Sequence, residues 1–351
     1  MRRSISMFAV LAVCESPRAT QQPAPDPTPA PRGPATFLKG QLHLHSNNSG
    51  DSRTPPDEVA RWYAAHGYDF IVFTDHNRVT DTADVGDMLV LPGMEITMNV
   101  DDCDPPPEGP LCPLHVNALA IDLHAPAPSV PSPADHRRDT LYRHGIALAR
   151  SLGAIAQINH PNFHYAVDAA LLATLAGEGP LLVEIANEAI DSNNAGDARH
   201  PSTEAIWDDA LRRGAVVWGT ATDDAHHYAD AEAVRAAGEL AFEGDRGWVM
   251  VRADRDADAI AAALLRGDFY ATNGALLDEV GCAATGLHVV PSDRRARIEC
   301  IDAAGVRAPG SDGLTCALGD RFVRARVHDR AGRTAWTQPC FSAPRAGADA
   351  G

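Results

Sequence analysis

The chain has 351 residues, of which 45% are hydrophobic, enough for a buried core and for one large domain with a smaller companion. Its 30 lysine and arginine residues are outnumbered by 47 acidic residues, and the formal net charge is -17. Nucleic-acid binding depends on cationic side chains that displace counterions from phosphates, so we expect no DNA or RNA partner. An anionic substrate must be held locally, for example by metal ions.

The first 19 residues are typical of an export signal. "MRRSISMFAVLAVC" places two arginines before an apolar run that ends at Cys14 and is too short to span a bilayer as a mature helix. "LAVC" is similar to signals whose cysteine becomes lipidated, and residues 20–35 continue as a proline-rich tether. We therefore predict an exported, periplasmic or cell-envelope protein, attached to a membrane only through Cys14. The alternative is a disordered N-terminus from a misassigned start.

Short apolar segments alternate with longer amphipathic ones from residue 36 to 274, which is typical of β/α units around a parallel sheet or barrel. The expected strands are 41–45, 70–74, 88–91, 116–121, 154–159, 181–185 and 216–220. Thr54 is expected to cap a first helix that ends at Gly67. The other expected helices are 138–152, 166–176, 203–213 and 256–266.

The segment that follows, residues 275–343, has short β-like runs separated by turns such as "GSDG" and "RAG". This pattern predicts a small all-β module. Residues 344–351, "PRAGADAG", are expected to form a disordered tail.

The cysteines after Cys14 form an even set, as expected for disulfides in an oxidising compartment. Cys103 and Cys112 lie in one short proline-rich loop and are expected to pair with each other. The pairing of the other four cannot be deduced from the sequence; they are Cys282, Cys300, Cys316 and Cys340. A structural zinc site is the weaker interpretation because C-x-x-C pairs are absent.

Imidazoles and carboxylates gather near the ends of the expected strands. His43 and His45 are two residues apart on the first strand, so they point to the same face. An H-x-H pair alone is weak evidence, since exposed polar positions on a strand give the same pattern. The other candidates lie at later strand ends or in adjacent loops: Asp51, Asp75, His76, Glu95, His115, His160, Asp224 and His226. Loops at the carboxyl ends of barrel strands converge on the axis, and nitrogen and oxygen ligands suit zinc, manganese or iron.

The ordered series H-x-H with a downstream Asp, T-D-H, G-x-E, a lone His, N-H-P and D-x-H runs from residue 40 to about 273. It resembles the polymerase and histidinol phosphatase (PHP) domain family of metal-dependent phosphoesterases. "GDFYATNG" and "RFVRARVHDRAGRTAWTQP" are similar to an exported branch of carbaryl-hydrolase-like metallohydrolases. The resemblance implies an α/β fold, a distorted seven-stranded (β/α)7 barrel, with two to three divalent metal ions (Zn, Mn or Fe).

The resemblance also implies which side chains hold each ion. The first ion would be held by His43, His45, Glu95 and Asp224. The second would be held by Glu95, His115 and His160, with Glu95 bridging the two. The third would be held by Asp51, His76 and His226. Some relatives have histidine where this chain has Asp51, which leaves occupancy of the third position open.

Four further residues are expected to act around the metals. Asp75 is expected to orient a metal-binding imidazole through its free ring N–H. Arg53 and Arg78 lie beside the first ligand motifs and would contact a phosphate, although ordinary solvated surface positions explain them equally well. Glu184 follows the sixth strand and would face the substrate or hydrogen-bond at the barrel mouth.

The predicted function is an exported metal-dependent hydrolase that uses a metal-bridging hydroxide on a small phosphomonoester or phosphodiester. A carboxylic or carbamic ester is the alternative substrate, since the same hydroxide attacks a carbonyl carbon. A third hypothesis is a non-catalytic wall or glycan-binding protein. It does not explain the concentrated ligands, whose repulsion and desolvation would cost stability without metal.

Overall fold

The computed structural model describes residues 37–342, apart from 107, 110, 126 and 131–134. The expected export signal with Cys14, the tether at 20–35 and the tail at 344–351 lie outside the described residues. Among the helices that are described, none is long and apolar enough to cross a membrane.

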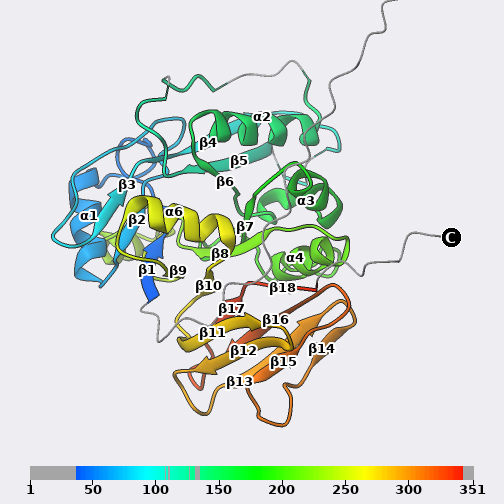
Figure 1. Cartoon of the computed structure of the whole chain (residues 1–351). Helices are drawn as coiled ribbons and strands as arrows, with labels where there is room; N and C mark the ends of the chain where they lie inside the picture. The colour runs from blue at the N-terminus through cyan, green and yellow to red at the C-terminus, as the bar shows by residue number, and fades with distance from the viewer. Residues whose placement is uncertain (1–36, 107, 110, 126, 131–134, 343–351) are drawn as a thin grey trace, which may run out of the picture.

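The first part of the chain is a mixed α/β structure (Figure 1). Its strands are β1 (Phe37–Gln41), β2 (Phe70–Val72), β3 (Leu89–Leu91), β4 (Gly93–Val100), β5 (Cys112–Leu119), β6 (Ile155–Ile158), β7 (Leu182–Asn187), β8 (Trp218–Thr222), β9 (Trp248–Arg252) and β10 (Phe269–Thr272). Its helices are α1 (Pro56–Ala65), α2 (Arg138–Ser151), α3 (Ala169–Ala176), α4 (Thr203–Arg212), α5 (Ala231–Ala236) and α6 (Ala257–Arg266), with a short 3-10 turn at Phe163–Tyr165.

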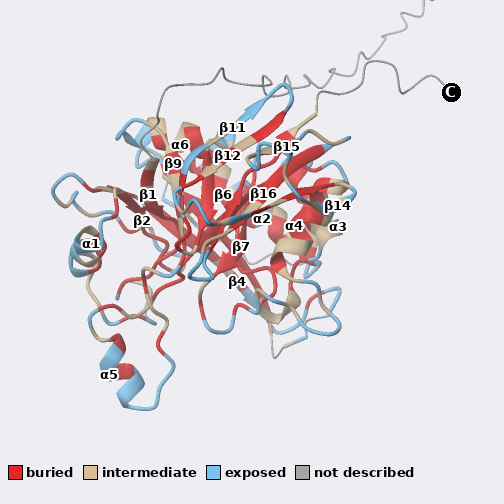
Figure 2. Ribbon diagram, turned by 90° about the horizontal axis from the view of Figure 1, so that it is seen from below, coloured by how far each residue is buried: buried red, intermediate tan, exposed pale blue. Residues whose placement is uncertain are grey.

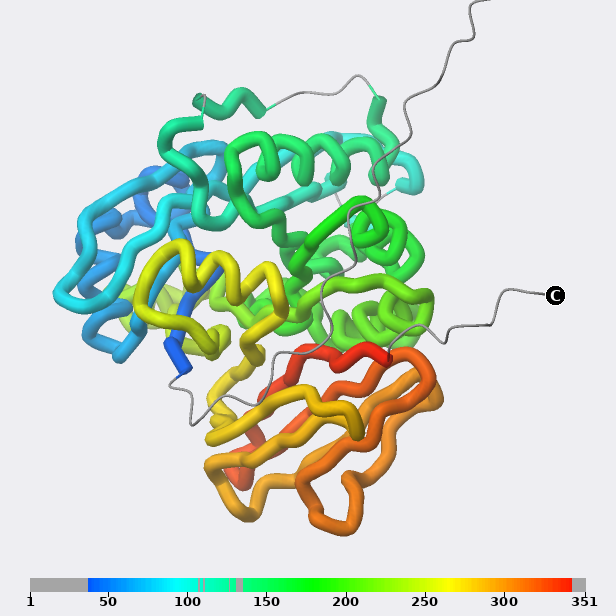
Figure 3. The backbone as a smooth tube through the Cα atoms, in the orientation of Figure 1, coloured from blue at the N-terminus to red at the C-terminus, as the bar shows by residue number. Residues whose placement is uncertain are grey.

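The second part contains only strands and turns among its described residues, and it forms one end of the molecule (Figure 3). The strands are β11 (Leu277–Ala283), β12 (Gly286–Pro291), β13 (Arg297–Asp302), β14 (Gly305–Arg307), β15 (Thr315–Ala317), β16 (Phe322–His328), β17 (Thr334–Thr337) and β18 (Cys340–Phe341). β11, β12 and β15 make a separate antiparallel sheet. β17 pairs with β10, so the two parts share one continuous sheet.

The expected single barrel is not formed, because the strands of the first part fall into two open sheets. One sheet has the order β14-β13-β16-β17-β10-β9-β1-β2-β3 with β18 beside β16, and the other has the order β4-β5-β6-β7-β8. Parallel neighbours need a crossover of a dozen or more residues. β3 and β4 are separated by Pro92 alone, and the described residues form no helix between β4 and β5, which pair antiparallel. The assumed regular β/α alternation is therefore wrong in this region.

The two sheets meet at isolated bridges between single residues. Leu44, just after β1, pairs with Ala225, just after β8, and His76, just after β2, pairs with Glu95 on β4. Each bridge therefore contains a candidate ligand or its neighbour. The arrangement brings the ends of both sheets together at one place.

Helix boundaries agree with the expected ones to within three residues, but two local signals were misjudged. Pro55 precedes α1 and no side chain caps that helix, so the predicted Thr54 cap is wrong. α3 begins at Ala169 because Asp168 accepts a hydrogen bond from Leu171 N at 2.8 Å. β4, β9, β10 and α5 were not predicted. The short helix α5 extends from the body, with its outer face exposed (Figure 2).

All six cysteines of the described chain form disulfides. The expected Cys103–Cys112 bridge is confirmed and closes the loop between β4 and β5. Cys282 pairs with Cys340, and Cys300 pairs with Cys316. These last two bridges tie strands of the second part to one another.

Candidate metal centre

His43 and His45 enter the centre through the segment that follows β1. Gln41 accepts hydrogen bonds from the backbone N–H groups of Leu42 and His43, and Leu44 exchanges hydrogen bonds with the Thr74 hydroxyl. Leu42 and Leu44 are fully buried in hydrophobic clusters. The predicted alternation is therefore present, although β1 itself ends before the two histidines.

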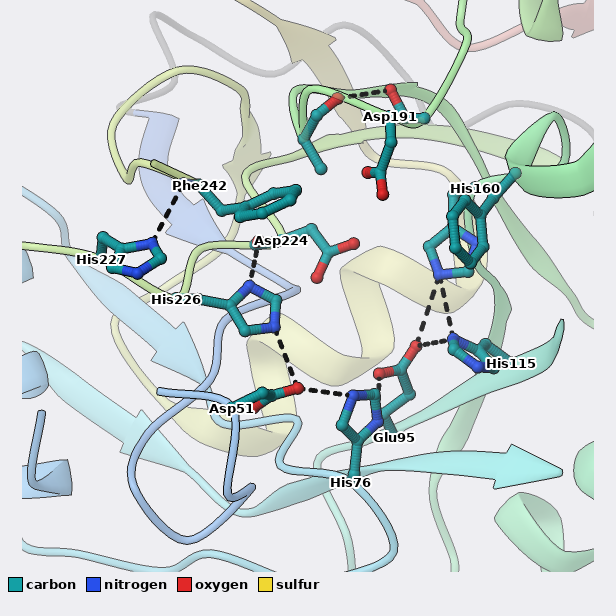
Figure 4. Close-up of a pocket in the computed structure, with 13 residues that line it drawn as sticks. Asp51, His76, Glu95, His115, His160, Asp191, Asp224, His226, His227 and Phe242 are labelled. Atoms are coloured by element: carbon teal, nitrogen blue, oxygen red, sulfur yellow. Dashed lines mark hydrogen bonds and ion pairs between the residues drawn. The ribbon is translucent and has the colours of Figure 1, made fainter. Parts of the chain in front are cut away.

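The predicted ligands assemble into three neighbouring groups, each with ligand atoms within 4.8 Å of one another. The groups are His43, His45 and Asp224; Glu95, His115 and His160; and His45, Asp51, His76 and His226. In Figure 4, His115 and His160 lie on one side of the Glu95 carboxylate, and Asp51 and His226 lie on the other. The third group differs from the expected one by including His45, whose ring stacks on His226 at a centroid distance of 4.3 Å.

Glu95 lies at the centre of these groups. Its carboxylate is 3.0 Å from His115 Nδ1 and 2.8 Å from His76 Nδ1, and it is 3.5 Å from His43 Nε2. Asn159, directly before His160, donates a 2.7 Å hydrogen bond to the same carboxylate. Glu95 was expected just after the third strand, and it lies on a further buried strand, β4.

Within the ligand groups, two buried ring nitrogens have no hydrogen-bond partner among the described residues: His43 Nε2 and His45 Nε2. Both lie 3.2 Å from Asp224 Oδ1. Their opposite ring nitrogens are occupied, His43 Nδ1 by Glu184 at 2.7 Å and His45 Nδ1 by the Ser49 hydroxyl at 2.9 Å. Buried polar atoms are rarely left without a partner, and metal-binding imidazoles normally use their second nitrogen in this way. These residues fit a metal ion.

Glu95 and His45 are held in the protonation states that bind metal at neutral pH. Burial opposes ionisation of Glu95, but the imidazoles of His115, His76 and His43 outweigh it and hold the pKa of Glu95 well below its usual range. Burial, reinforced by His226, lowers the pKa of His45 to about 4. An ionised carboxylate and a neutral imidazole are the forms that bind metal.

For His76, neighbouring carboxylates outweigh the effect of burial on the pKa. Burial lowers its pKa, but Glu95 and Asp51 together raise it to about 10. Asp51 Oδ2 lies 3.0 Å from His76 Nε2 and 3.2 Å from His226 Nε2. Metal binding by this group must therefore release a proton.

Asp75 was expected to orient an imidazole, but its hydrogen-bond partners are other groups. Its carboxylate accepts hydrogen bonds from Ser46 N at 2.6 Å, from Ser46 Oγ at 2.7 Å and from Thr80 Oγ1 at 2.5 Å. These bonds fix the loop that follows His45. The orienting role belongs to Glu184, which is fully buried and holds His43 instead of facing substrate. Glu184 also accepts the backbone N–H of His160 at 2.6 Å.

A pocket of about 270 Å³ opens over the ligand groups. Residues outside the ligand set that line it are Phe163, Ala189, Asp191, Ser192, His227 and Phe242. Within the described chain no lysine or arginine lines the pocket. Arg53 and Arg78 are exposed and are not among the lining residues, so their contact with a phosphate stays a prediction.

The sequence interpretation did not identify Phe163, Asp191 or Phe242, which line this pocket. Phe163 stands within the "INHPNF" run, together with Asn159 and Asn162, which do not line the pocket. The closeness of this run to His160 was a usable signal. Asp191 and Phe242 had no comparable signal, because the folding of two long loops places them at the pocket.

Comparisons with known proteins give distant likenesses. No protein-family model and no curated protein matches the chain. A solved two-domain protein from Bacteroides vulgatus, described as containing a predicted PHP-like metal-dependent phosphoesterase, is 17% identical, with 92% of each chain covered and a TM-score of 0.46. An amidohydrolase from Chromobacterium violaceum with bound sulfate and no metal is 15% identical over 53% of this chain and 87% of its own, with a TM-score of 0.35. Likenesses at this level establish neither activity nor ligand, which depend on the geometry of the site.

Proposed function

We propose that the chain is a metal-dependent hydrolase of the PHP family that cleaves a small phosphomonoester or phosphodiester. The observation that carries the proposal is the position of Glu95, whose single carboxylate contacts imidazoles of all three ligand groups. A carboxylate in this position is suited to bridging neighbouring cations. Divalent ions bound there would supply a nucleophilic hydroxide at neutral pH and neutralise charge on phosphoryl oxygens.

We assign the clustered side chains to three ions, with Glu95 added to the group of His43, His45 and Asp224. The first ion would be held by His43, His45, Glu95 and Asp224. The second would be held by Glu95, His115 and His160. The third would be held by Asp51, His76 and His226, with His45 close by.

The chain's own contribution is to fix these ligands before substrate binds. Glu184 holds the His43 ring with Nε2 directed inward, and Ser49 does the same for His45. Asn159 orients Glu95 by donating to one of its oxygens. Ligands held in this way pay little reorganisation energy during reaction.

A phosphate ester is favoured over a carbonyl ester because each non-bridging phosphoryl oxygen gives the metals an anionic partner. The pocket lining lacks lysine and arginine among the described residues, so a phosphate would depend on metal for its charge balance. The carboxylic or carbamic ester remains the second candidate, because Phe163 and Phe242 offer apolar walls to an aryl group. Only a substrate panel separates the two.

Three disulfides in the described chain support export, because disulfides persist in oxidising compartments. We include in the proposal a periplasmic or cell-envelope location, with lipid attachment through Cys14. The partner is a small phosphorylated or ester substrate.

The test uses full-length protein loaded with manganese or zinc and three substrates: a phosphomonoester, a phosphodiester and an aryl carbamate. Glu95→Ala should lower bound metal and reduce turnover at least about a hundredfold, because the variant loses the bridging carboxylate. Glu58→Ala, an exposed change on α1, serves as the control and should leave both unchanged. Turnover of the carbamate alone would move the protein to the carbonyl-hydrolase class, and near-normal turnover in Glu95→Ala would reject the metal assignment.

A further inference from the structure

The loop after β7 presents to the pocket a carboxylate that belongs to none of the three ligand groups. Asp191 is exposed and lines the pocket, and its side chain points toward the space between Asp224 and His160 (Figure 4). Among the described residues it has no hydrogen-bond or ion-pair partner. Its carboxylate is therefore available to a bound molecule.

Side-chain hydrogen bonds hold this loop in one shape. Asn194 donates to Asn187 O at 2.6 Å and accepts from Asn187 N at 3.2 Å, while Ser192 Oγ donates to Asn187 O at 2.5 Å and to Ala189 O at 2.8 Å. Asn162 donates to Asn193 O at 3.0 Å, which links the loop to the segment carrying His160. The backbone on both sides of Asp191 is thus fixed without using the Asp191 side chain. Such preorganisation is expected of a residue that recognises a ligand.

Among the described residues, no lysine or arginine lines the pocket beside Asp191. Phe163 lies beside His160 at a centroid distance of 5.2 Å, and Phe242 lies beside His226 at 5.5 Å. Both rings line the same pocket, and the described lining has no lysine or arginine. If the phosphate of a substrate bound at the ligand groups, the rest of that substrate would therefore lie beside two apolar rings and one free carboxylate.

We propose that Asp191 is a specificity-determining residue that selects the charge of the alcohol part of the substrate. It accepts a hydrogen bond from an ammonium or hydroxyl group on that part and disfavours a second anionic group. The inference rests on the proposed phosphoesterase function, since it describes the part of the substrate that is not phosphate. It predicts phosphate esters of amino or polyhydroxy alcohols in preference to bisphosphates or phosphocarboxylates.

The test measures binding separately from turnover. Aminoethylphosphonate, hydroxyethylphosphonate and phosphonopropionate share a non-hydrolysable phosphonate head and differ in the charge of the distal group. Calorimetric titration of each into full-length, metal-loaded protein should give affinities that fall in that order, with about tenfold between the first and the last. Asp191→Asn should reduce this ratio to about twofold or less.

Asp254→Asn is the matched control, because it removes the same charge from an exposed position beyond β9 and outside the pocket, and it should keep the wild-type ratio. An equal ratio in Asp191→Asn and wild type, or no discrimination in wild type, would overturn the inference while leaving phosphoester turnover untouched. Failure of all three phosphonates to bind metal-loaded protein would overturn the inference and the phosphoesterase proposal together.

Discussion

Glu184 determines which nitrogen of His43 faces the ligand groups. Its Oε1 lies 2.7 Å from His43 Nδ1 and also accepts from the Thr222 hydroxyl at 2.7 Å, so the ring is held from behind. Glu184→Gln keeps the shape of the side chain and removes its negative charge. That charge makes His43 Nε2 a better electron-pair donor to a metal ion. Metal affinity should fall about tenfold to a hundredfold, as measured by competition with a chelating dye. Glu188→Gln, the same change outside the ligand groups, is the control, and equal affinities in the two variants would refute the role.

The residues of the centre were predictable to the extent that they lie in short ordered motifs. His43 and His45 follow from strand alternation, and Asp224 and His226 from their place after a late strand. Glu184 and Asp75 show the limit of the sequence. Their hydrogen-bond partners depend on how distant parts of the chain pack together, and Glu184 lies 141 positions from His43. No local pattern encodes such a contact.

At the scale of elements, α2 joins the disulfide loop to the turn that carries Phe163. Arg138, buried at the start of α2, donates to the carbonyl oxygens of Tyr165 at 3.2 Å and Ala166 at 3.3 Å, and to Pro106 O. Arg138→Ala leaves these carbonyls unpaired and should lower the free energy of unfolding by about 2–4 kcal/mol, as measured by urea titration. Arg138→Lys retains the charge without the planar fork and should give an intermediate loss. A loss below about 0.5 kcal/mol in Arg138→Ala would show that the connection is unimportant.

The elements themselves were easiest to predict where helices and strands alternate. α2, α4 and α6 have long amphipathic patterns, and burial confirms their inner faces. β4 was missed because "GMEITMNV" begins directly after β3, where the assumed β/α alternation places no second strand. Sequence periodicity reports burial on one face of an element. It does not report the antiparallel pairing that opens the barrel into two sheets.

For the whole molecule, a buried ionic cluster joins the strand-only part to the α/β part. Arg324 on β16 is fully buried, donates to Asp208 through Nε at 2.6 Å and through Nη2 at 2.8 Å, and reaches Glu204 at 2.6 Å. Its guanidinium lies 4.7 Å from the Trp207 ring centre. Together with the pairing of β17 and β10, this cluster predicts that the two parts unfold as one cooperative unit.

Arg324→Met tests that prediction, because it leaves Asp208 on α4 buried without its cation, while Glu204 keeps only Arg326, at 2.9 Å. The free energy of unfolding should fall by about 3–5 kcal/mol, measured by denaturant titration followed by tryptophan fluorescence and by far-ultraviolet circular dichroism. Arg213→Met breaks an exposed pair with Asp209 on the same helix and should change it by less than about 0.5 kcal/mol. If the parts are coupled, both probes shift together in Arg324→Met. Two separated transitions, with only one displaced, would mean that the strand-only part folds independently and that its contact with α4 does not stabilise the ligand-bearing sheets.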